Sequence, residues 1–189
     1  MSEERVSRLP LPAESELPPD IQELFAANRA KPGFVPNVFR AMSMRPAVLR
    51  GFIALYDALM AEAGGLSKAE RELIAVAVSA QNHCHYCLVS HGAVLRIRTK
   101  DARLADTVAA NYRAADLLPR QHAMLDYAVK VTRASAEIGD ADHAALRAHG
   151  FSDADIFDIT QIAAFFNYSN RAASALGMRP NEEFYTMAR

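Results

Sequence analysis

The sequence has no tryptophan, only two cysteines in 189 residues, and no long apolar run. Two cysteines cannot build the disulfide framework of a small secreted domain. No stretch approaches the ~20 apolar residues that span a bilayer, and residues 1–20 lack the apolar core of a signal peptide. These absences predict a cytoplasmic protein that has no membrane partner.

Neither positive nor negative charge is concentrated in one part of the sequence. The formal net charge is −1, and Lys and Arg are scattered along the chain. A nucleic-acid-binding protein usually carries a basic stripe or patch, so no nucleic-acid partner is expected. The hydrophobic fraction of 51% in a chain of this length is enough for one domain with a full-sized core.

Apolar residues recur at helical spacing along most of the chain, and no segment alternates as a strand does. We therefore predict an all-α fold, with residues 1–19, which hold four prolines, as an irregular N-terminal arm and residues 20–189 as a single helical domain. Prolines and glycines mark the ends of the helices. The predicted helices are Asp20–Ala30, Asn37–Met44, Pro46–Glu62, Ser67–Gln81, Cys84–Arg98, Lys100–Ala115, Pro119–Glu137, Asp140–His149 and Ser152–Leu176.

The helix predicted from residue 67 is apolar nearly all round, which indicates a position deep in the bundle. Ser67 and Glu70 have the spacing of a capping box and mark its start. Lys68, Glu70 and Arg71 are interpreted as surface charges of its first turn. Glu72 differs, because it lies inside the apolar segment, where a carboxylate is usually paired or functional.

A weak internal repeat relates this helix to the predicted helix at residues 152–176. The two segments, "LSKAERELIAVAVSAQNHC" and "FSDADIFDITQIAAFFNYS", align without gaps at an offset of 85 residues. Ser67 matches Ser152, and Asn82 matches Asn167, whereas Cys84 faces a serine. The alignment suggests a duplicated helical unit in which only the first copy carries cysteines.

Both cysteines lie in the segment "NHCHYCLVSHG", Asn82–Gly92. On a helix, Cys84, Cys87 and His91 share one face, because they are three and four residues apart. The reactive form of cysteine is the thiolate, and a free thiol has a pKa near ~8.5. The helix N-terminus favours a thiolate at Cys84, whereas His91, one turn beyond Cys87, is a candidate base for that thiol.

Glu72 is the candidate that orients His91. If the chain reverses near Asn82 and His83, the two helices form a hairpin. Glu72 then lies roughly 15 Å before the turn and His91 roughly 12 Å after it, at the rise of a regular helix. The two side chains are therefore expected at similar height.

The series Glu72, Cys84, Cys87 and His91 resembles the core motif of the alkylhydroperoxidase AhpD-like family, also called the carboxymuconolactone decarboxylase-like family. The segment "SKAERELIAVAVSAQNHCHYCLVSHG" carries that motif. The segments "GFVPNVFRAMSMRPAVLRGF" and "FFNYSNRAASALGM" are similar to the peroxidase-related branch of the family. The resemblance covers most of the chain.

The resemblance implies an all-helical bundle whose core is a helix hairpin carrying the C-x-x-C motif, assembled as a dimer, trimer or hexamer. It also implies a hydroperoxide reductase without a cofactor or a metal. Cys87 would be the peroxidatic residue and Cys84 the resolving residue, with His91 and Glu72 as the proton relay. The implied partners are an organic hydroperoxide and a thiol or lipoyl-type reductant.

The sequence departs from the best-known peroxidase of this family at one position. That enzyme has a histidine immediately before its second cysteine, where this chain has Tyr86, and a histidine, His85, stands one residue earlier. Tyr86 and His85 are therefore candidate relay or site-lining residues. Asn167 is a further candidate, whose side chain could either line the site or cap backbone groups.

Other functions stay open at this point. A decarboxylase-like lyase acting on a lactone acid could use the same scaffold without redox cycling of the cysteines. A zinc module could use Cys84, Cys87 and His91 with His83 or His85, but ligands crowded onto one helix do not easily surround a metal. The spacing of the two thiols favours a thiol peroxidase or a related disulfide oxidoreductase.

Overall fold

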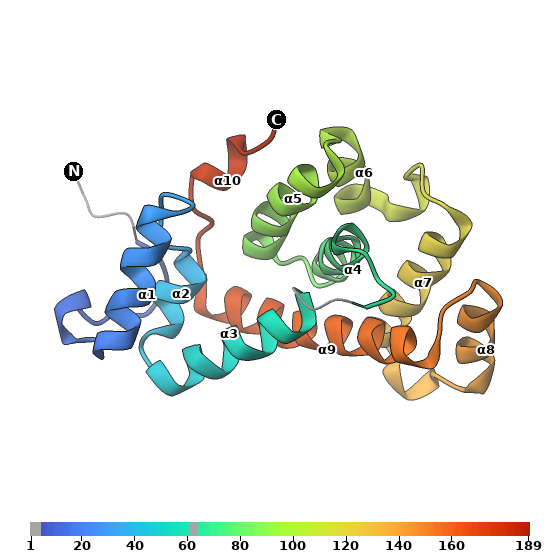
Figure 1. Cartoon of the computed structure of the whole chain (residues 1–189), viewed down its shortest axis with the longest axis horizontal. Coiled ribbons are helices and arrows are strands. Elements are labelled where there is room, and N and C mark those ends of the chain that lie inside the picture. The colour runs from blue at the N-terminus through green and yellow to red at the C-terminus, as the bar shows by residue number, and fades with distance from the viewer. Residues whose placement is uncertain (1–4, 61–63) are drawn as a thin grey trace.

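The computed structural model describes residues 5–60 and 64–189, and within these ranges all regular structure is helical (Figure 1). This confirms the all-α prediction. The α-helices are α1 (Pro19–Ala30), α2 (Asn37–Met42), α3 (Pro46–Met60), α4 (Lys68–Gln81), α5 (His85–Thr99), α6 (Ala102–Asn111), α7 (Pro119–Ala134), α8 (Asp140–Ala148), α9 (Asp153–Leu176) and α10 (Glu183–Thr186). Three single-turn 3-10 helices are η1 (Glu14–Glu16), η2 (Tyr112–Ala114) and η3 (Ser135–Glu137).

Helix α4 lies at the centre of the bundle and packs against α5, α6, α7 and α9 (Figure 1). Its residues from Leu73 to Val78 are at most 1% exposed, as its nearly continuous apolar sequence predicts. The predicted capping box is present: Ser67 Oγ accepts from the Glu70 amide at 3.2 Å, and Glu70 Oε2 accepts from the Ser67 amide at 2.9 Å. Burial of this helix fixes the position of the motif that follows it.

Helix α9 repeats several features of α4, as the internal alignment suggests. It begins with the same capping box, formed here by Ser152 and Asp155. The two helices pack against each other, and the aligned residues Ile74 and Ile159 are both fully buried. α9 therefore forms the second long element of the core and runs beneath α4 and α5 in the view of Figure 1.

The segment around Val6 and Arg8 packs onto this core. Val6, which lies in the segment predicted to be an irregular arm, is buried. Its carbonyl accepts from the Arg179 amide at 3.0 Å, and the Arg8 amide donates to the Leu176 carbonyl at 2.7 Å. The Arg8 side chain lies against Gly177, which ends α9 with φ of +59°. A side chain at position 177 would clash, because its Cβ would lie 2.9 Å from the Arg8 side chain.

Several helix ends differ from their predicted positions. The helix predicted from Lys100 to Ala115 begins later, because Lys100 is left-handed (φ 56°) and Asp101 caps α6, and its last turn is the 3-10 helix η2. The helix predicted to reach Glu137 likewise ends in a 3-10 turn, η3. Glu62, the predicted end of α3, lies outside the described residues. The short helix α10 was not predicted.

The interpretation of Glu70 and Arg71 as surface charges is wrong. They are 4% and 1% exposed, because the first turn of α4 is covered by neighbouring elements. Glu70 is paired with Arg120 at 2.7 Å. Arg71 pairs with Asp158 at 2.9 Å and donates to the Leu59 carbonyl at 2.6 Å.

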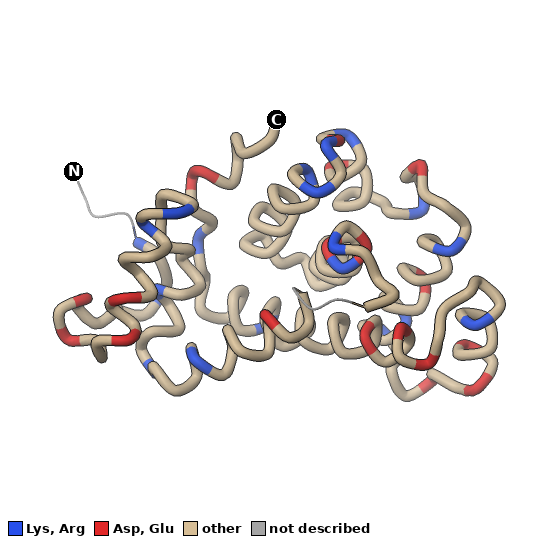
Figure 2. The backbone as a smooth tube through the Cα atoms, viewed as in Figure 1, with Lys and Arg blue, Asp and Glu red and all other residues tan. Residues whose placement is uncertain are grey.

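Charged residues lie mostly on the outside of the bundle. Figure 2 shows Lys and Arg distributed among Asp and Glu along the described backbone rather than gathered in one stripe. In the described part of the chain, no helix has the length and apolar character needed to cross a membrane.

Candidate active site

The two cysteines lie at the turn of the hairpin formed by α4 and α5. Asn82 ends α4, and His83 reverses the chain with a left-handed backbone (φ 51°). Cys84 is the N-cap residue of α5, and its amide donates to the Ser79 carbonyl at 3.0 Å. Cys87 follows in the first turn, so the hairpin predicted from the sequence brings both sulfur atoms to the start of one buried helix.

Both cysteines are reduced, and each is 1% exposed. Interaction with the Cys87 thiol, supported by the Cys87 backbone amide and by Ser174, lowers the pKa of Cys84 to about 6. Conversely, interaction with Cys84 and burial raise the pKa of Cys87, although Asn170 and Ser169 oppose this rise. The first proton to leave the pair therefore comes from the thiol at the helix N-terminus, where the helix dipole favours an anion.

His91 and Glu72 meet across the hairpin as the sequence predicts. Their Nδ1 and Oε2 atoms are 2.8 Å apart, and the two side chains are 14% and 5% exposed. A carboxylate accepts the Nδ1 proton and so leaves Nε2 as the free nitrogen of a neutral imidazole. The ring of Phe166 packs edge-to-face against His91, with a centroid distance of 4.6 Å, which further restricts the orientation of the imidazole.

A small cavity of about 130 Å³ opens beside this pair. Its volume is below the range of about 300–1,000 Å³ that holds drug-sized ligands. Cys87 and His91 contribute to its wall, whereas Cys84 does not. The other lining residues come from the segment before α2 and from α2, α3, α5, α9 and α10 and are mostly apolar or aromatic: Pro36, Val38, Phe39, Phe52, Tyr56, Tyr86, Ser90, Val94, Ser169 and Phe184.

Tyr86 is a wall residue of this cavity. Its hydroxyl accepts a hydrogen bond from the Val38 amide at 3.1 Å. This amide lies in the first turn of α2, where backbone amides have no partner within the helix. Burial raises the pKa of Tyr86, so the phenol stays protonated. Tyr86 thus attaches α2 to the helix that carries the cysteines.

The other two candidate residues, His85 and Asn167, lie outside the cavity. His85 is exposed, and its Nε2 lies 2.9 Å from the hydroxyl of Tyr185 in α10. Asn167 accepts from Asn82 at 3.0 Å and donates to Thr132 at 3.1 Å. His85 therefore contacts the C-terminal segment, and Asn167 belongs to a polar network behind the cysteines.

Within residues 5–60 and 64–189, no three side chains of the types His, Cys, Asp and Glu gather in a group that could hold a metal ion. His83, one of the ligands considered for zinc, is exposed, and His85 is turned toward Tyr185. Cys84, Cys87 and His91, the other ligands considered, belong to the hairpin of α4 and α5.

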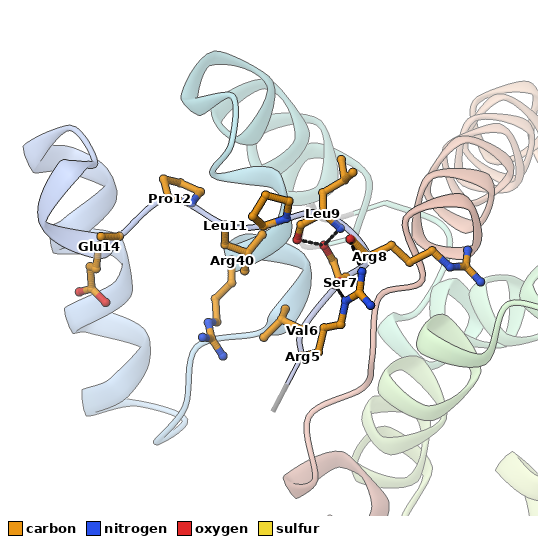
Figure 3. Close-up of a pocket in the computed structure, with 11 residues that line it drawn as sticks. Arg5, Val6, Ser7, Arg8, Leu9, Leu11, Pro12, Glu14 and Arg40 are labelled. Atoms are coloured by element: carbon orange, nitrogen blue, oxygen red, sulfur yellow. Dashed lines mark hydrogen bonds between the residues drawn. The ribbon is translucent and has the colours of Figure 1, made fainter. Parts of the chain in front are cut away.

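A larger hollow of about 840 Å³ lies between the N-terminal segment and α2 (Figure 3). Arg5, Arg8 and Arg40 line it, but two of these guanidinium groups bind main-chain carbonyls. Arg5 Nε donates to the Ser7 carbonyl at 2.9 Å, and Arg8 Nη1 donates to carbonyls at the end of α9. The hollow is therefore a packing feature of the arm, and neither cysteine lines it.

The sequence interpretation missed four aromatic residues of the cavity, which are Phe39, Phe52, Tyr56 and Phe184. Tyr56 lies on α3, where its spacing indicates only the apolar face of a helix. Phe184 lies on α10, where no helix was predicted. For Phe184 the one available signal was its place in the segment "NEEFYTM", where two aromatic residues occur among mostly polar ones.

Comparison with known proteins adds to this geometry. The model of the carboxymuconolactone decarboxylase family matches residues 46–130. An AhpD-core, uncharacterized peroxidase-related protein from Ralstonia eutropha JMP134 is 53% identical over 98% of both chains, with a TM-score of 0.96. An uncharacterized peroxidase-related protein from Silicibacter sp. TM1040 is 46% identical over 100% of this chain and 99% of its own, with a TM-score of 0.95.

More distant structures share the fold. The debrominase Bmp8 is 18% identical over 97% of this chain and 95% of its own, with a TM-score of 0.77. At this identity the likeness concerns the fold alone. No curated protein sequence matches the chain.

Proposed function

The chain belongs to the carboxymuconolactone decarboxylase family, among its AhpD-like members, and from this membership we propose that it is a thiol-dependent hydroperoxide reductase. Cys87 is the peroxidatic residue and Cys84 the resolving residue. The observation that carries this proposal is the position of Cys87, which lines the small apolar cavity together with His91, whereas Cys84 lies behind it. The size and lining of the cavity favour small apolar hydroperoxides.

The shifted acidities of the two thiols support a shared thiolate. At neutral pH the pair carries one negative charge, which rests mainly on Cys84 because its pKa is lowered to about 6. Transfer of the Cys87 proton to Nε2 of His91 produces the nucleophile inside the cavity. A group with a raised pKa is thereby used as a thiolate without release of its proton to solvent.

In the first step, the Cys87 thiolate attacks the terminal peroxide oxygen. A sulfur–oxygen bond forms, the oxygen–oxygen bond breaks, and the electron pair leaves on the alkoxide, which takes up one proton and becomes the alcohol. The cysteine is oxidised to a sulfenic acid, and the peroxide is reduced. His91, held by Glu72, supplies the proton to the alkoxide when it has first accepted it from Cys87.

In the second step, the Cys84 thiolate attacks the sulfur of the sulfenic acid. A disulfide forms, and the hydroxide that leaves is protonated to water. The lowered pKa of Cys84 suits this step because the attacking sulfur is already charged at neutral pH. Two electrons from a thiol or lipoyl-type reductant then restore both thiols.

A decarboxylase-like lyase remains the second candidate. The family model that matches is named for that activity, and the buried His91–Glu72 pair is a general base that needs no thiol. In a lyase, replacement of either cysteine by serine would leave turnover largely intact. In the reductase, Cys87 is indispensable.

The test is consumption of tert-butyl hydroperoxide with dithiothreitol or dihydrolipoamide as the reductant, on the wild type and on Cys87→Ser and Cys84→Ser. The wild type should turn over, Cys87→Ser should fall to the uncatalysed rate, and Cys84→Ser should add one oxygen to Cys87 by mass. A His85→Ala variant, altered outside the cavity, is the control. Turnover by Cys87→Ser, or none by the wild type, would contradict the proposal.

We also propose that the protein is a cytoplasmic homo-oligomer. Large apolar side chains exposed on two helices support association: they include Val48 and Leu55 on α3 and Phe157 and Tyr168 on α9. Light scattering at micromolar concentration should give a mass of at least twice the 20.7 kDa of one chain. A monomer mass would contradict this.

A further inference from the structure

Tyr56 is a polar residue of the cavity for which the proposed mechanism has no use. It lies on α3 and lines the cavity with Cys87 and His91. Among the residues that the structure describes, its hydroxyl has no hydrogen-bond partner, whereas the hydroxyl of Tyr86 accepts from the Val38 amide. The side chain is partly buried at the wall of the cavity, so this hydroxyl is free to bond a molecule that enters the cavity.

The surroundings hold the ring of Tyr56 in place. Its centroid lies 6.1 Å from that of Phe165 and 6.5 Å from that of Phe52, with which it stacks at 16°. It also lies 6.1 Å from the centroid of His91. Three aromatic neighbours, one of them the proposed base His91, therefore restrict the ring of Tyr56.

The charge near Tyr56 makes it a donor rather than a base. Burial raises the pKa of Tyr56, and the negative charge of Glu72 raises it further. The phenol therefore keeps its proton at any physiological pH. A neutral hydroxyl in an apolar site is suited to donate a hydrogen bond to an oxygen on which negative charge develops.

We propose that Tyr56 is a further catalytic residue, which donates a hydrogen bond to the oxygen that leaves when Cys87 attacks the hydroperoxide. This rests on the proposed reductase function and adds a second group to its chemistry. Tyr56 stabilises the alkoxide as the oxygen–oxygen bond breaks, and the proton that completes the alcohol comes from His91. Tyr56 itself is neither oxidised nor left deprotonated.

If Tyr56 acts in this way, the effect of losing its hydroxyl should depend on the leaving group of the substrate. A hydroperoxide releases an alkoxide, which is a strong base and needs stabilisation in the transition state. A peracid releases a carboxylate, which is stable without a hydrogen bond. Loss of the Tyr56 hydroxyl should therefore slow reduction of the first class and spare the second.

The experiment compares oxidation of the reduced wild type and of Tyr56→Phe by tert-butyl hydroperoxide and by peracetic acid. Removal of one oxyanion donor should slow the hydroperoxide reaction roughly 100–1,000-fold, with a change of less than about threefold for the peracid. Iodoacetamide alkylation, which has no oxygen leaving group, should keep its rate. Tyr168→Phe, which alters a half-exposed ring outside the cavity, should match the wild type in all three reactions.

Equal slowing of both oxidants would mean that Tyr56 only shapes the cavity, and this would overturn the proposal. An unslowed hydroperoxide reaction would overturn it as well while leaving the reductase function intact. A wild type that reduces neither oxidant would contradict the reductase function, and the role of Tyr56 would fall with it. Selective slowing of the hydroperoxide supports both.

Discussion

Asn82 and Asn167, which occupy equivalent positions 85 residues apart, are hydrogen bonded to each other: Asn82 Nδ2 donates to Asn167 Oδ1 at 3.0 Å. The same amide group donates to Asn170 Oδ1 at 2.9 Å, and Asn170 Nδ2 donates to Ser79 Oγ at 3.0 Å. The end of α4 and the equivalent position inside α9 thus meet in one polar network. Asn170 extends from this network toward Cys87, where its side chain opposes the rise in the pKa of that thiol.

Replacement of Asn82 by alanine should destabilise the fold. Asn170 is 1% exposed, so the loss of its donor leaves a buried acceptor unsatisfied at a cost of about 1–3 kcal/mol. Urea unfolding measures this change. The control is Asn28→Ala, in which the lost amide bonds only the Leu24 carbonyl of its own helix; an equal loss of stability in both variants would show that the network has no special weight.

The parts of the site that follow from the sequence are those fixed by short-range geometry. Cys84, Cys87 and His91 share a face because a helix repeats every three to four residues, and one chain reversal is enough to bring Glu72 to His91. The capping box of α4 is equally local. In each case the residues are close along the chain, and helix geometry alone is enough to predict their contact.

The walls of the cavity could not be predicted, because they depend on how distant helices pack. Tyr56 and Phe184 reach the cavity from α3 and α10, and no periodicity in either segment states which partner its apolar face will meet. Arg71 shows the same limit: a charge in the first turn of a helix is usually exposed, but here Asp158, from a helix far along the chain, covers it.

A pH titration of the reduced protein should resolve two very different thiols. Thiolate absorbance should rise by one equivalent as the pH increases through about 6, since Cys84 loses its proton there, and by the second only at much higher pH. In Cys84→Ser, the pKa of Cys87 should fall, because the neighbour that raises it is gone. A single titration of both thiols near the ordinary pKa of cysteine would contradict the shared-thiolate mechanism.

Phe184 should control which hydroperoxides fit. It closes one side of the cavity and packs edge-to-face on Phe34 at 5.0 Å. Phe184→Ala should raise the ratio of kcat/KM for cumene hydroperoxide to that for tert-butyl hydroperoxide roughly tenfold, a change typical of altered apolar contacts. Because both substrates are measured on the same variant, this ratio does not depend on the fraction of that variant that is folded. Phe157→Ala, which removes a 62% exposed ring, is the control, and an unchanged ratio in Phe184→Ala would contradict the assigned role.

The contact between His91 and Glu72 predicts coupled effects on Cys87. A Cys84→Ser background isolates this thiol. In that background His91→Ala should raise the pKa of Cys87, because the nearby base and its positive charge after protonation are lost. Glu72→Gln should act in the same direction but more weakly, since it removes only the charge that supports a protonated His91.

The double variant should be no worse than His91→Ala alone, because both residues act along one proton path and their effects do not add. Rates of iodoacetamide alkylation across a range of pH measure the pKa in each variant, and His85→Ala controls for the loss of an exposed imidazole. Below the pKa the thiol is protonated and unreactive, so a raised pKa appears as a shift of the rate profile to higher pH. An unshifted profile in His91→Ala would mean that the helix N-terminus alone activates the site, and Cys84 would then be the better candidate for the nucleophile.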